Sequence, residues 1–330
     1  MAEESTEFLQ ERTPKDAFVF RILSLDGGGI RGVFEAAFLA AIQDTLESPL
    51  ASYFDLIAGT STGGIIALGL GLGITPSGLL DFYRLHGPQI FQRSGTFLPT
   101  WVHWLRDKVR HKYRSQYLRF AVEQAFAHKK LGDSANRLLI PAFNLSAGEI
   151  HVYKTRHHPR LQMDHKVSAV DVALATSAAP TYFPTHRSEE HMLLIDGGIW
   201  ANNPTGLAVV EAVTLLEIPR TEIDVLSIGC TQEISDFTQG GSGELQWARR
   251  AIDCAILGQS FGSMGTAAML VGHNSIFRVS PPVSKGRFSL DSSKGIDQLE
   301  ALGRFEARKA LPELKRRFVN QTAPRFTPSQ

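Results

Sequence analysis

The stretch FVFRILSLDGGGIRG, residues 18–32, decides the fold. Its first part, residues 18–25, is a short apolar run that ends at glycines, which is typical of a buried strand. Three consecutive glycines follow, and the apolar periodicity of residues 33–46 predicts a helix directly after this turn. A buried strand that leads through a glycine turn into a helix is the opening unit of an α/β fold.

The rest of the chain continues this alternation of strands and helices. Strands are predicted over residues 53–59, 137–145, 149–155, 192–196 and 222–229, and helices over residues 62–72, 168–179, 205–217, 244–273 and 297–318. We therefore predict an α/β fold of three layers, in which helices cover both faces of a central, mostly parallel sheet. It forms one domain over residues 17–319, between flexible tails at 1–16 and 320–330.

Composition excludes several classes of function. The chain has 34 Lys and Arg against 33 Asp and Glu, a formal net charge of +1, which argues against a nucleic-acid binder. Neither the two cysteines, Cys230 and Cys254, nor the eleven histidines show the spacing of metal ligands, so we expect no metal and no cofactor. The polar, acidic residues 1–16 do not resemble a signal peptide, and the apolar run 57–74 is rich in Gly, Thr and Ser. We expect a cytoplasmic protein, and the sequence gives no signal for an oligomeric state.

The glycine turn supports two interpretations. Gly27, Gly29 and Gly32 match the GxGxxG fingerprint of dinucleotide-binding proteins, although the acidic residue expected about 20 positions later is replaced by a second glycine motif. In either case, backbone N–H groups at a helix N-terminus favour an anion. That anion is either a pyrophosphate or the oxyanion of an attacked carbonyl group.

The second glycine motif is Gly59-Thr60-Ser61-Thr62-Gly63, between a predicted strand and a predicted helix. This is the G-x-S-x-G pattern of a nucleophile elbow, in the strand–turn–helix context that the elbow requires. In a parallel sheet both glycine motifs lie at the carboxyl ends of neighbouring strands. The pair therefore predicts a nucleophile, Ser61, beside an oxyanion hole.

A third motif, Asp196-Gly197-Gly198, closes the predicted strand 192–196. Alone, this aspartate would suggest an Asx-turn or a helix cap. Together, DGGGIRG (26–32), GTSTGG (59–64) and DGG (196–198), with ATSAAPTYFP (175–184) and ANNP (201–204), resemble the patatin-like phospholipases.

The resemblance implies a lipid acyl hydrolase with a Ser–Asp dyad, in which Ser61 is the nucleophile and Asp196 its base. It places the oxyanion hole at Gly27, Gly28 and Gly29, with Arg31 nearby. The remaining motif glycines are Gly32, Gly59, Gly63, Gly197 and Gly198. The implied substrates are membrane glycerophospholipids, reached by transient contact with the inner face of the membrane.

The N-terminal block ILSLDGGGIRG and the compact length are also similar to bacterial patatin-like effectors of cyclic-oligonucleotide antiphage defence. This narrower resemblance implies a cyclic nucleotide as a candidate activator. The aromatic and basic stretch 101–119 is either a membrane-facing segment or a solvated helix face. The stretch 251–272 either lines an acyl-chain pocket or packs as an ordinary helix.

Two alternatives remain open at this point. A conventional α/β-hydrolase would use Ser61 with Asp196 or Asp224 and with His273, in the chain order Ser, Asp, His. A protein without catalytic activity would use the GxGxxG turn to bind a nucleotide.

Overall fold

The computed structural model describes residues 18–91, 112–233 and 244–329. Within these residues the strands form one eight-stranded sheet, in the order β5-β6-β3-β2-β1-β7-β9 with β4 also paired to β3, and one two-stranded sheet. The strands of the large sheet are β1 (Phe20–Leu25), β2 (Leu56–Gly59), β3 (Arg137–Asn144), β4 (Glu149–Lys154), β5 (His186–Arg187), β6 (Leu193–Asp196), β7 (Ile223–Ile228) and β9 (Ile276–Val279). The small sheet pairs β8 (Gln232–Glu233) with β10 (Pro282–Val283).

The centre of the large sheet is parallel, as the sequence predicts. Strands β9, β7, β1, β2 and β3 pair in parallel, whereas β4 and β6 run antiparallel to β3. Every residue of β1 and β7 is buried, because helices cover both faces of the sheet. The carboxyl ends of the parallel strands therefore meet at one edge, where loops that are distant in the sequence come together.

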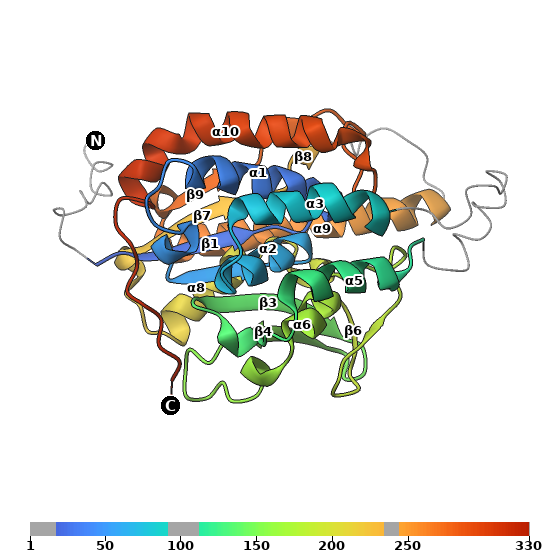
Figure 1. Cartoon of the computed structure of the whole chain (residues 1–330), viewed down its shortest axis with the longest axis horizontal. Helices are drawn as coiled ribbons and strands as arrows, with labels where there is room; N and C mark the ends of the chain where they lie inside the picture. The colour runs from blue at the N-terminus through green and yellow to red at the C-terminus, as the bar shows by residue number, and fades with distance from the viewer. Residues whose placement is uncertain (1–17, 92–111, 234–243, 330) are drawn as a thin grey trace, which may run out of the picture.

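Helices form the outer layers, and Figure 1 shows α1, α3 and α10 along one side of the sheet. The helices of this layer are α1 (Gly32–Gln43), α2 (Thr62–Gly71), α3 (Pro76–Ile90), α5 (Ser115–Phe126), α6 (Ala169–Thr176) and α10 (Ile296–Arg317). They share one core cluster with Leu23 and Leu25 of β1. The opposite layer, α8 (Thr205–Thr214) and α9 (Glu244–Val271), packs on Phe20 and Ile22 of the same strand. This alternation along β1 is the period-2 pattern of a strand buried on both faces.

One described helix is long and apolar enough to span a membrane by length and composition, namely the stretch Cys254–Val271 of α9. Ala267 and Val271 pack into the core under the sheet, so this stretch also forms a layer of the folded domain. The predicted apolar run 57–74 becomes β2 and the buried helix α2 instead.

The C-terminal residues lie along the domain, where the sequence predicted a flexible tail. The Ala323 N–H donates to the Ser52 carbonyl group, and the Ser329 N–H donates to that of Arg156. The guanidinium group of Arg137 stacks over the Phe326 ring at 5.1 Å from its centroid. The tail predicted at residues 1–16 and most of the stretch 101–119 lie outside the described residues.

Candidate active site

Ser61 occupies a sharp turn between β2 and α2, as the G-x-S-x-G pattern predicts. Its backbone has φ 55° and ψ −118°, a conformation that is rare for a residue with a side chain and that stores strain. The Ser61 N–H donates to Thr176 Oγ1 at 3.0 Å, which holds the turn. Gly63 has no side chain because a Cβ there would lie 2.5 Å from the Leu25 carbonyl oxygen. The start of α2 therefore packs directly on the end of β1.

Asp196, the last residue of β6, lies beside Ser61 although 135 residues separate them in the sequence. The Ser61 hydroxyl donates to Asp196 Oδ2 at 2.6 Å. The other carboxylate oxygen, Oδ1, accepts from the Gly198 N–H at 2.6 Å. The serine and the carboxylate thus form a directly bonded pair, with both carboxylate oxygens engaged.

Burial tunes the basicity of this carboxylate. It raises the pKa of Asp196 to about 6, while the hydrogen bonds from Ser61 and Gly198 lower it. The carboxylate is therefore ionised at neutral pH but more basic than an exposed aspartate. A pKa close to the working pH is what general-base catalysis requires.

The glycine turn lies next to the serine, but Gly27 differs from its predicted role. A Cβ on Gly27 would lie 3.4 Å from Ser61 Cβ and 2.4 Å from Asn202 Oδ1. The Gly27 N–H donates to the Asn202 carbonyl oxygen at 2.8 Å. Gly27 therefore ties the turn to the loop after Asp196, and its N–H is not free to bind an oxyanion.

Gly28 and Gly29 keep the predicted donor capacity. Among the residues described, neither N–H group donates to another protein group. Gly29 has φ 58°, in the left-handed region that favours glycine, and a Cβ there would meet the Leu290 carbonyl oxygen at 2.3 Å. Arg31 closely follows the glycines, and its Nε donates to the Gly28 carbonyl oxygen at 3.4 Å.

The other motif glycines share one property, which is that a Cβ would collide with a neighbouring element. The colliding atoms are Thr62 Oγ1 at 2.2 Å for Gly32, the Gly63 carbonyl oxygen at 2.1 Å for Gly59, the Pro141 carbonyl oxygen at 2.3 Å for Gly197 and Asp196 Oδ1 at 3.0 Å for Gly198. These glycines let the three loops of the site approach one another closely.

A buried polar cluster supports the glycine turn and was not foreseen from the sequence. Arg278 of β9 donates to both oxygens of Asp26, through Nη1 to Oδ1 at 2.9 Å and through Nη2 to Oδ2. The Asp26 N–H donates to Glu35 Oε1 at 3.1 Å. Burial raises the pKa of Asp26, which Arg278 opposes, and raises that of Glu35 well above its ordinary value. The cluster thus joins the Asp26–Arg278 ion pair to the buried carboxyl group of Glu35 beneath the glycine turn.

Helix α9 fixes the loop that follows Asp196. Gln259 donates to the Gly198 carbonyl oxygen at 3.0 Å and accepts from the Asn202 N–H at 3.1 Å. Ser263 donates to the Asn203 carbonyl oxygen at 2.7 Å. The ANNP motif drew attention to this loop, but no pattern in the sequence pointed to Gln259.

The alternative triad is not assembled in this structure. Asp224 lies at the amino end of β7 and pairs with Arg317, and His273 precedes β9 at the same edge of the sheet. Ser61 follows β2 and lies at the opposite, carboxyl edge. The nucleotide alternative also loses one donor of the fingerprint, because the Gly27 N–H is already bonded to the Asn202 carbonyl oxygen. In the described part of the chain, no three His, Cys, Asp or Glu residues group as a metal site would require.

Comparison with known proteins gives the family. The sequence pattern of the family "Patatin-like phospholipase" matches residues 23–209, which is more than half of the chain. Over 304 residues the chain is 34% identical to a "cGAMP-activated phospholipase" of Pseudomonas aeruginosa, covering 88% of this chain and 89% of that protein. It is 36% identical over 229 residues to a protein of the same name from Vibrio cholerae, covering 64% of each.

Among solved structures, VipD from Legionella pneumophila matches with a TM-score of 0.49 and 12% identity, over 90% of this chain and 67% of that chain. A likeness this distant adds nothing to the assignment. The family pattern spans more than half of the sequence, and its three motifs meet at one edge of the sheet. The chain belongs to the patatin-like phospholipase family and is a lipid ester hydrolase.

Proposed function

We propose that the protein hydrolyses fatty-acyl esters of membrane glycerophospholipids with a Ser61–Asp196 dyad. The observation that carries this proposal is the 2.6 Å hydrogen bond from Ser61 Oγ to Asp196 Oδ2, on a strained elbow at the carboxyl edge of the sheet. Ser61 attacks the ester carbonyl carbon while Asp196 accepts the hydroxyl proton, and this proton passes to the leaving alcohol. Water, deprotonated by the same carboxylate, then attacks the acyl-enzyme and releases the fatty acid.

The glycine turn supplies the donors for the negative charge that develops on the carbonyl oxygen. We assign this role to the Gly28 and Gly29 N–H groups, because the Gly27 N–H is bonded to Asn202. A preorganised donor of this kind contributes about 3 to 4 kcal/mol to transition-state stabilisation. Such stabilisation compensates for the weak basicity of a carboxylate toward a hydroxyl group.

The exposed side of α9 is the surface that we assign to the membrane. It bears Phe261 and Met269, which are 59% and 88% exposed, and no charged residue lies between Cys254 and Val271. The other side of the same helix holds the loop after Asp196 through Gln259. A lipid surface on α9 would therefore lie close to the reacting groups, and the protein would act as a peripheral enzyme at the inner face of the membrane.

We propose that a cyclic nucleotide activates the enzyme and that the enzyme acts in antiphage defence. The relatives from Pseudomonas aeruginosa and Vibrio cholerae are both named cGAMP-activated phospholipases. The Ser61–Asp196 pair is almost fully buried, and neither of the two surface cavities described below is lined by it. The burial of this pair and its absence from both cavities agree with an enzyme whose active site opens after a ligand binds.

The test is active-site labelling combined with ester cleavage. A fluorophosphonate probe should modify the wild-type chain once, at Ser61, and should not modify Ser61→Ala. Ser61→Ala should also lose cleavage of a soluble activated ester by at least about 10⁴-fold. Labelling of a different residue, or ester cleavage that Ser61→Ala retains, would refute the assignment.

A further inference from the structure

A cleft of about 210 Å³ opens between α5 and the segment that leads into β5. It is separate from the catalytic pair, because neither Ser61 nor Asp196 lines it. Its lining residues are Ser115, Leu118, Arg119, Leu174, Ala178, Phe183, Pro184, Thr185, His186 and Arg187. The lining thus combines an apolar floor with two arginines and two hydroxyl groups.

The two arginines come from different walls of the cleft. Arg119 belongs to α5 and Arg187 to β5, and both are exposed. Arg119 lies 3.6 Å from Glu123, but both side chains are about half exposed, so this pair contributes little. Arg187 forms no ion pair with any residue described. Guanidinium groups bind phosphate oxygens in a bidentate geometry, so a phosphate between these walls would satisfy both.

The apolar residues at the bottom of the cleft indicate which chemical group the ligand carries next to its phosphate. Leu118, Leu174 and Phe183 are each less than a tenth exposed and form an apolar surface with one aromatic ring. Such a surface favours a ligand that carries a flat or apolar group next to its charge. A phosphodiester has this character, because the phosphate remains anionic while both of its ester oxygens carry organic groups.

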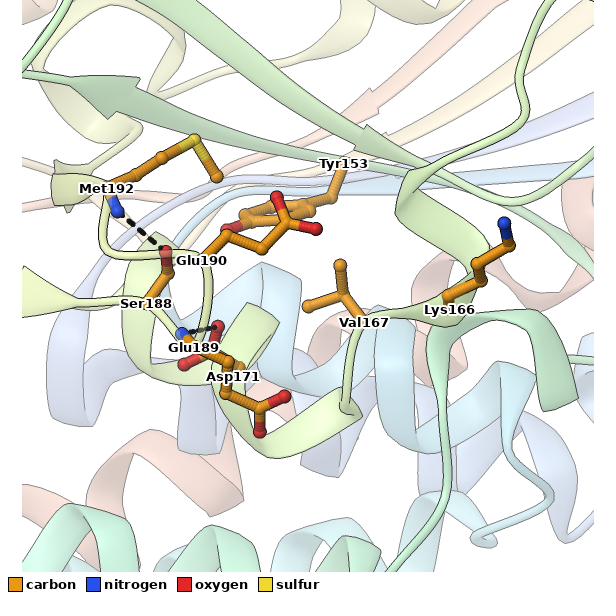
Figure 2. Close-up of a pocket in the computed structure, with 8 residues that line it drawn as sticks. All are labelled: Tyr153, Lys166, Val167, Asp171, Ser188, Glu189, Glu190 and Met192. Carbon is orange, nitrogen blue, oxygen red and sulfur yellow. Dashed lines mark hydrogen bonds between the residues drawn. The ribbon is translucent and has the colours of Figure 1, made fainter.

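A neighbouring cavity of about 80 Å³ is lined by three acidic residues, Asp171, Glu189 and Glu190, and by one basic residue, Lys166, so its net charge is negative. Figure 2 shows its lining, in which the Asp171 carboxylate accepts from the Glu189 N–H and Glu190 lies nearby. These carboxylates repel anions. His186 separates the two sites, since it lines the cleft and its Nε2 is bonded to Asp171. An anionic ligand on this side of the molecule is therefore directed to the cleft with the arginines.

The wall of the cleft is bonded directly to the catalytic pair. Leu174 and Ala178 face the cleft, and the same short segment contacts both reacting residues. Within it, Thr176 Oγ1 accepts from the Ser61 N–H at 3.0 Å, and the Ala178 carbonyl oxygen accepts from the Asp196 N–H at 3.1 Å. A ligand that orders or displaces residues 174–178 would therefore change how Ser61 and Asp196 meet.

We propose that this cleft binds a phosphodiester between Arg119 and Arg187, and that its occupancy regulates the Ser61–Asp196 pair through residues 174–178. This regulation rests on the proposed function of that pair. Two kinds of ligand contain such a phosphodiester, namely a soluble cyclic dinucleotide and the headgroup of a phospholipid. The experiment tests each kind with its own probe.

The first measurement is binding, made by calorimetry on full-length Ser61→Ala so that no ester is consumed. The probes are 3′,3′-cyclic GMP–AMP, cyclic di-AMP and monomeric dihexanoyl phosphatidylglycerol. We expect at least one probe to bind, and adding Arg119→Gln or Arg187→Gln to weaken it by about tenfold or more. Adding Arg220→Gln instead removes an exposed arginine that does not line the cleft, and it should leave the affinity unchanged.

The second measurement is turnover of a soluble ester by chains that retain Ser61. The bound probe should change turnover by about fivefold or more in wild type and Arg220→Gln, but not in Arg119→Gln or Arg187→Gln. Binding of the dinucleotides assigns the cleft to a soluble regulator, and binding of the phospholipid alone assigns it to a headgroup. The proposal is overturned if no probe binds, if the cleft variants bind like wild type, or if binding leaves turnover unchanged. The dyad is tested separately, by whether basal ester cleavage requires Ser61.

Discussion

Asp196 is the residue on which the proposed chemistry depends, because an ordinary aspartate is a weak base for a serine hydroxyl. Burial raises its pKa to about 6, so the carboxylate stays ionised near neutral pH while its basicity increases. Both of its oxygens accept hydrogen bonds, from Ser61 and from Gly198, which fixes its direction toward the nucleophile. Basicity and geometry are thus both set by the buried end of β6.

The rate of soluble-ester cleavage should fall on the acidic side of a carboxylate titration. Only the ionised form of Asp196 accepts a proton, so activity is lost as the pH falls through the folded-state pKa of about 6. A pH–rate profile from pH 4.5 to 8.5 measures this limb. A rate that stays constant down to pH 4.5 would show that Asp196 is not the base.

Asp196→Asn should abolish turnover without destabilising the fold. The folded-state pKa of about 6 lies above the ordinary 3.8, so the folded state favours the protonated form. The stability of that neutral form is fully present below about pH 4 and is lost as the pH rises through about 6. An asparagine avoids this loss, so at pH 8 the variant should unfold at an equal or higher temperature, with a gain of at most about 3 kcal/mol. Thermal unfolding of both proteins at pH 4.5 and pH 8 measures this, and a variant much less stable than wild type at pH 8 would contradict it.

His273→Ala should keep its turnover within about threefold of wild type, in contrast to the loss expected when a catalytic group is removed. The histidine lies before β9, at the amino edge of the sheet, and Ser61 lies at the carboxyl edge. The assay is soluble-ester cleavage, with Ser61→Ala as the inactive reference. Loss of activity as complete as in Ser61→Ala would favour a histidine-based mechanism.

At the residue scale, the sequence is sufficient where a motif follows a strand. Ser61 follows β2 within a glycine motif, so its place at the carboxyl edge follows from the parallel sheet. Asp196 ends β6, which runs antiparallel to β3, so its approach to Ser61 was implied by the family resemblance and not by the parallel sheet. The role of Gly27 does not follow in this way, since its N–H donates to the Asn202 carbonyl group. That partner is set by the packing of a loop about 175 residues later, and no local pattern encodes it.

At the scale of elements, β9 and α9 position the site although neither carries a reacting group. Arg278 of β9 holds Asp26 at the start of the glycine turn, and Gln259 of α9 holds the loop after Asp196. Both elements therefore act on the catalytic geometry through the loops that they bind.

Arg278→Gln should lower kcat by about 10- to 100-fold with a smaller change in KM, because it loosens the oxyanion donors rather than substrate binding. It also leaves Asp26 buried without its counter-ion, at a cost of about 3 to 5 kcal/mol. Asp26→Asn combined with Arg278→Gln removes both charges and should recover much of this stability. Arg84→Gln, which breaks an exposed pair with Glu300, is the control and should leave both quantities near wild type. Wild-type kcat in Arg278→Gln would contradict the positioning role.

Phe261→Glu should reduce fatty-acid release from anionic liposomes by about tenfold or more, because it places a charge on the surface that we propose meets the lipid. Cleavage of a soluble ester should not change, because the Phe261 side chain is exposed and lies on the side of α9 opposite Gln259, which holds the loop after Asp196. Thr214→Glu, on the neighbouring helix α8, is a matched control for added charge. Equal loss on both substrates, or no loss on liposomes, would contradict the membrane assignment.

The elements that the sequence did not predict all have a weak sequence signal for regular structure. Helix α3 contains Pro88 and a polar face, and β9 has only four residues, one of which is the charged Arg278. The segment 320–329 is polar and rich in proline, yet backbone hydrogen bonds such as Ala323 to Ser52 hold it to the domain. Contacts of this kind do not depend on side-chain type, so hydrophobic periodicity carries no information about them.

At the scale of the whole molecule, the catalytic groups and their supports come from different parts of the chain. The family pattern covers residues 23–209, which include Ser61, Asp196 and the glycine turn. The residues that contact these motifs and hold them in place lie after residue 209. They are Gln259, Arg278 and Leu290. The arrangement of the site was predictable from the shared motifs, whereas the contacts that hold these motifs in place come from the later part of this chain.

The most direct test of the dyad is fatty-acid release from defined phosphatidylglycerol liposomes, measured by mass spectrometry for wild type, Ser61→Ala, Asp196→Asn and His273→Ala. Each chain is assayed alone and with 3′,3′-cyclic GMP–AMP. Wild type and His273→Ala should release fatty acid at similar rates under the same condition, while Ser61→Ala and Asp196→Asn should both fall by about 10⁴-fold or to background. Asp196→Asn that keeps most of the wild-type rate, together with an inactive His273→Ala, would contradict the Ser61–Asp196 mechanism.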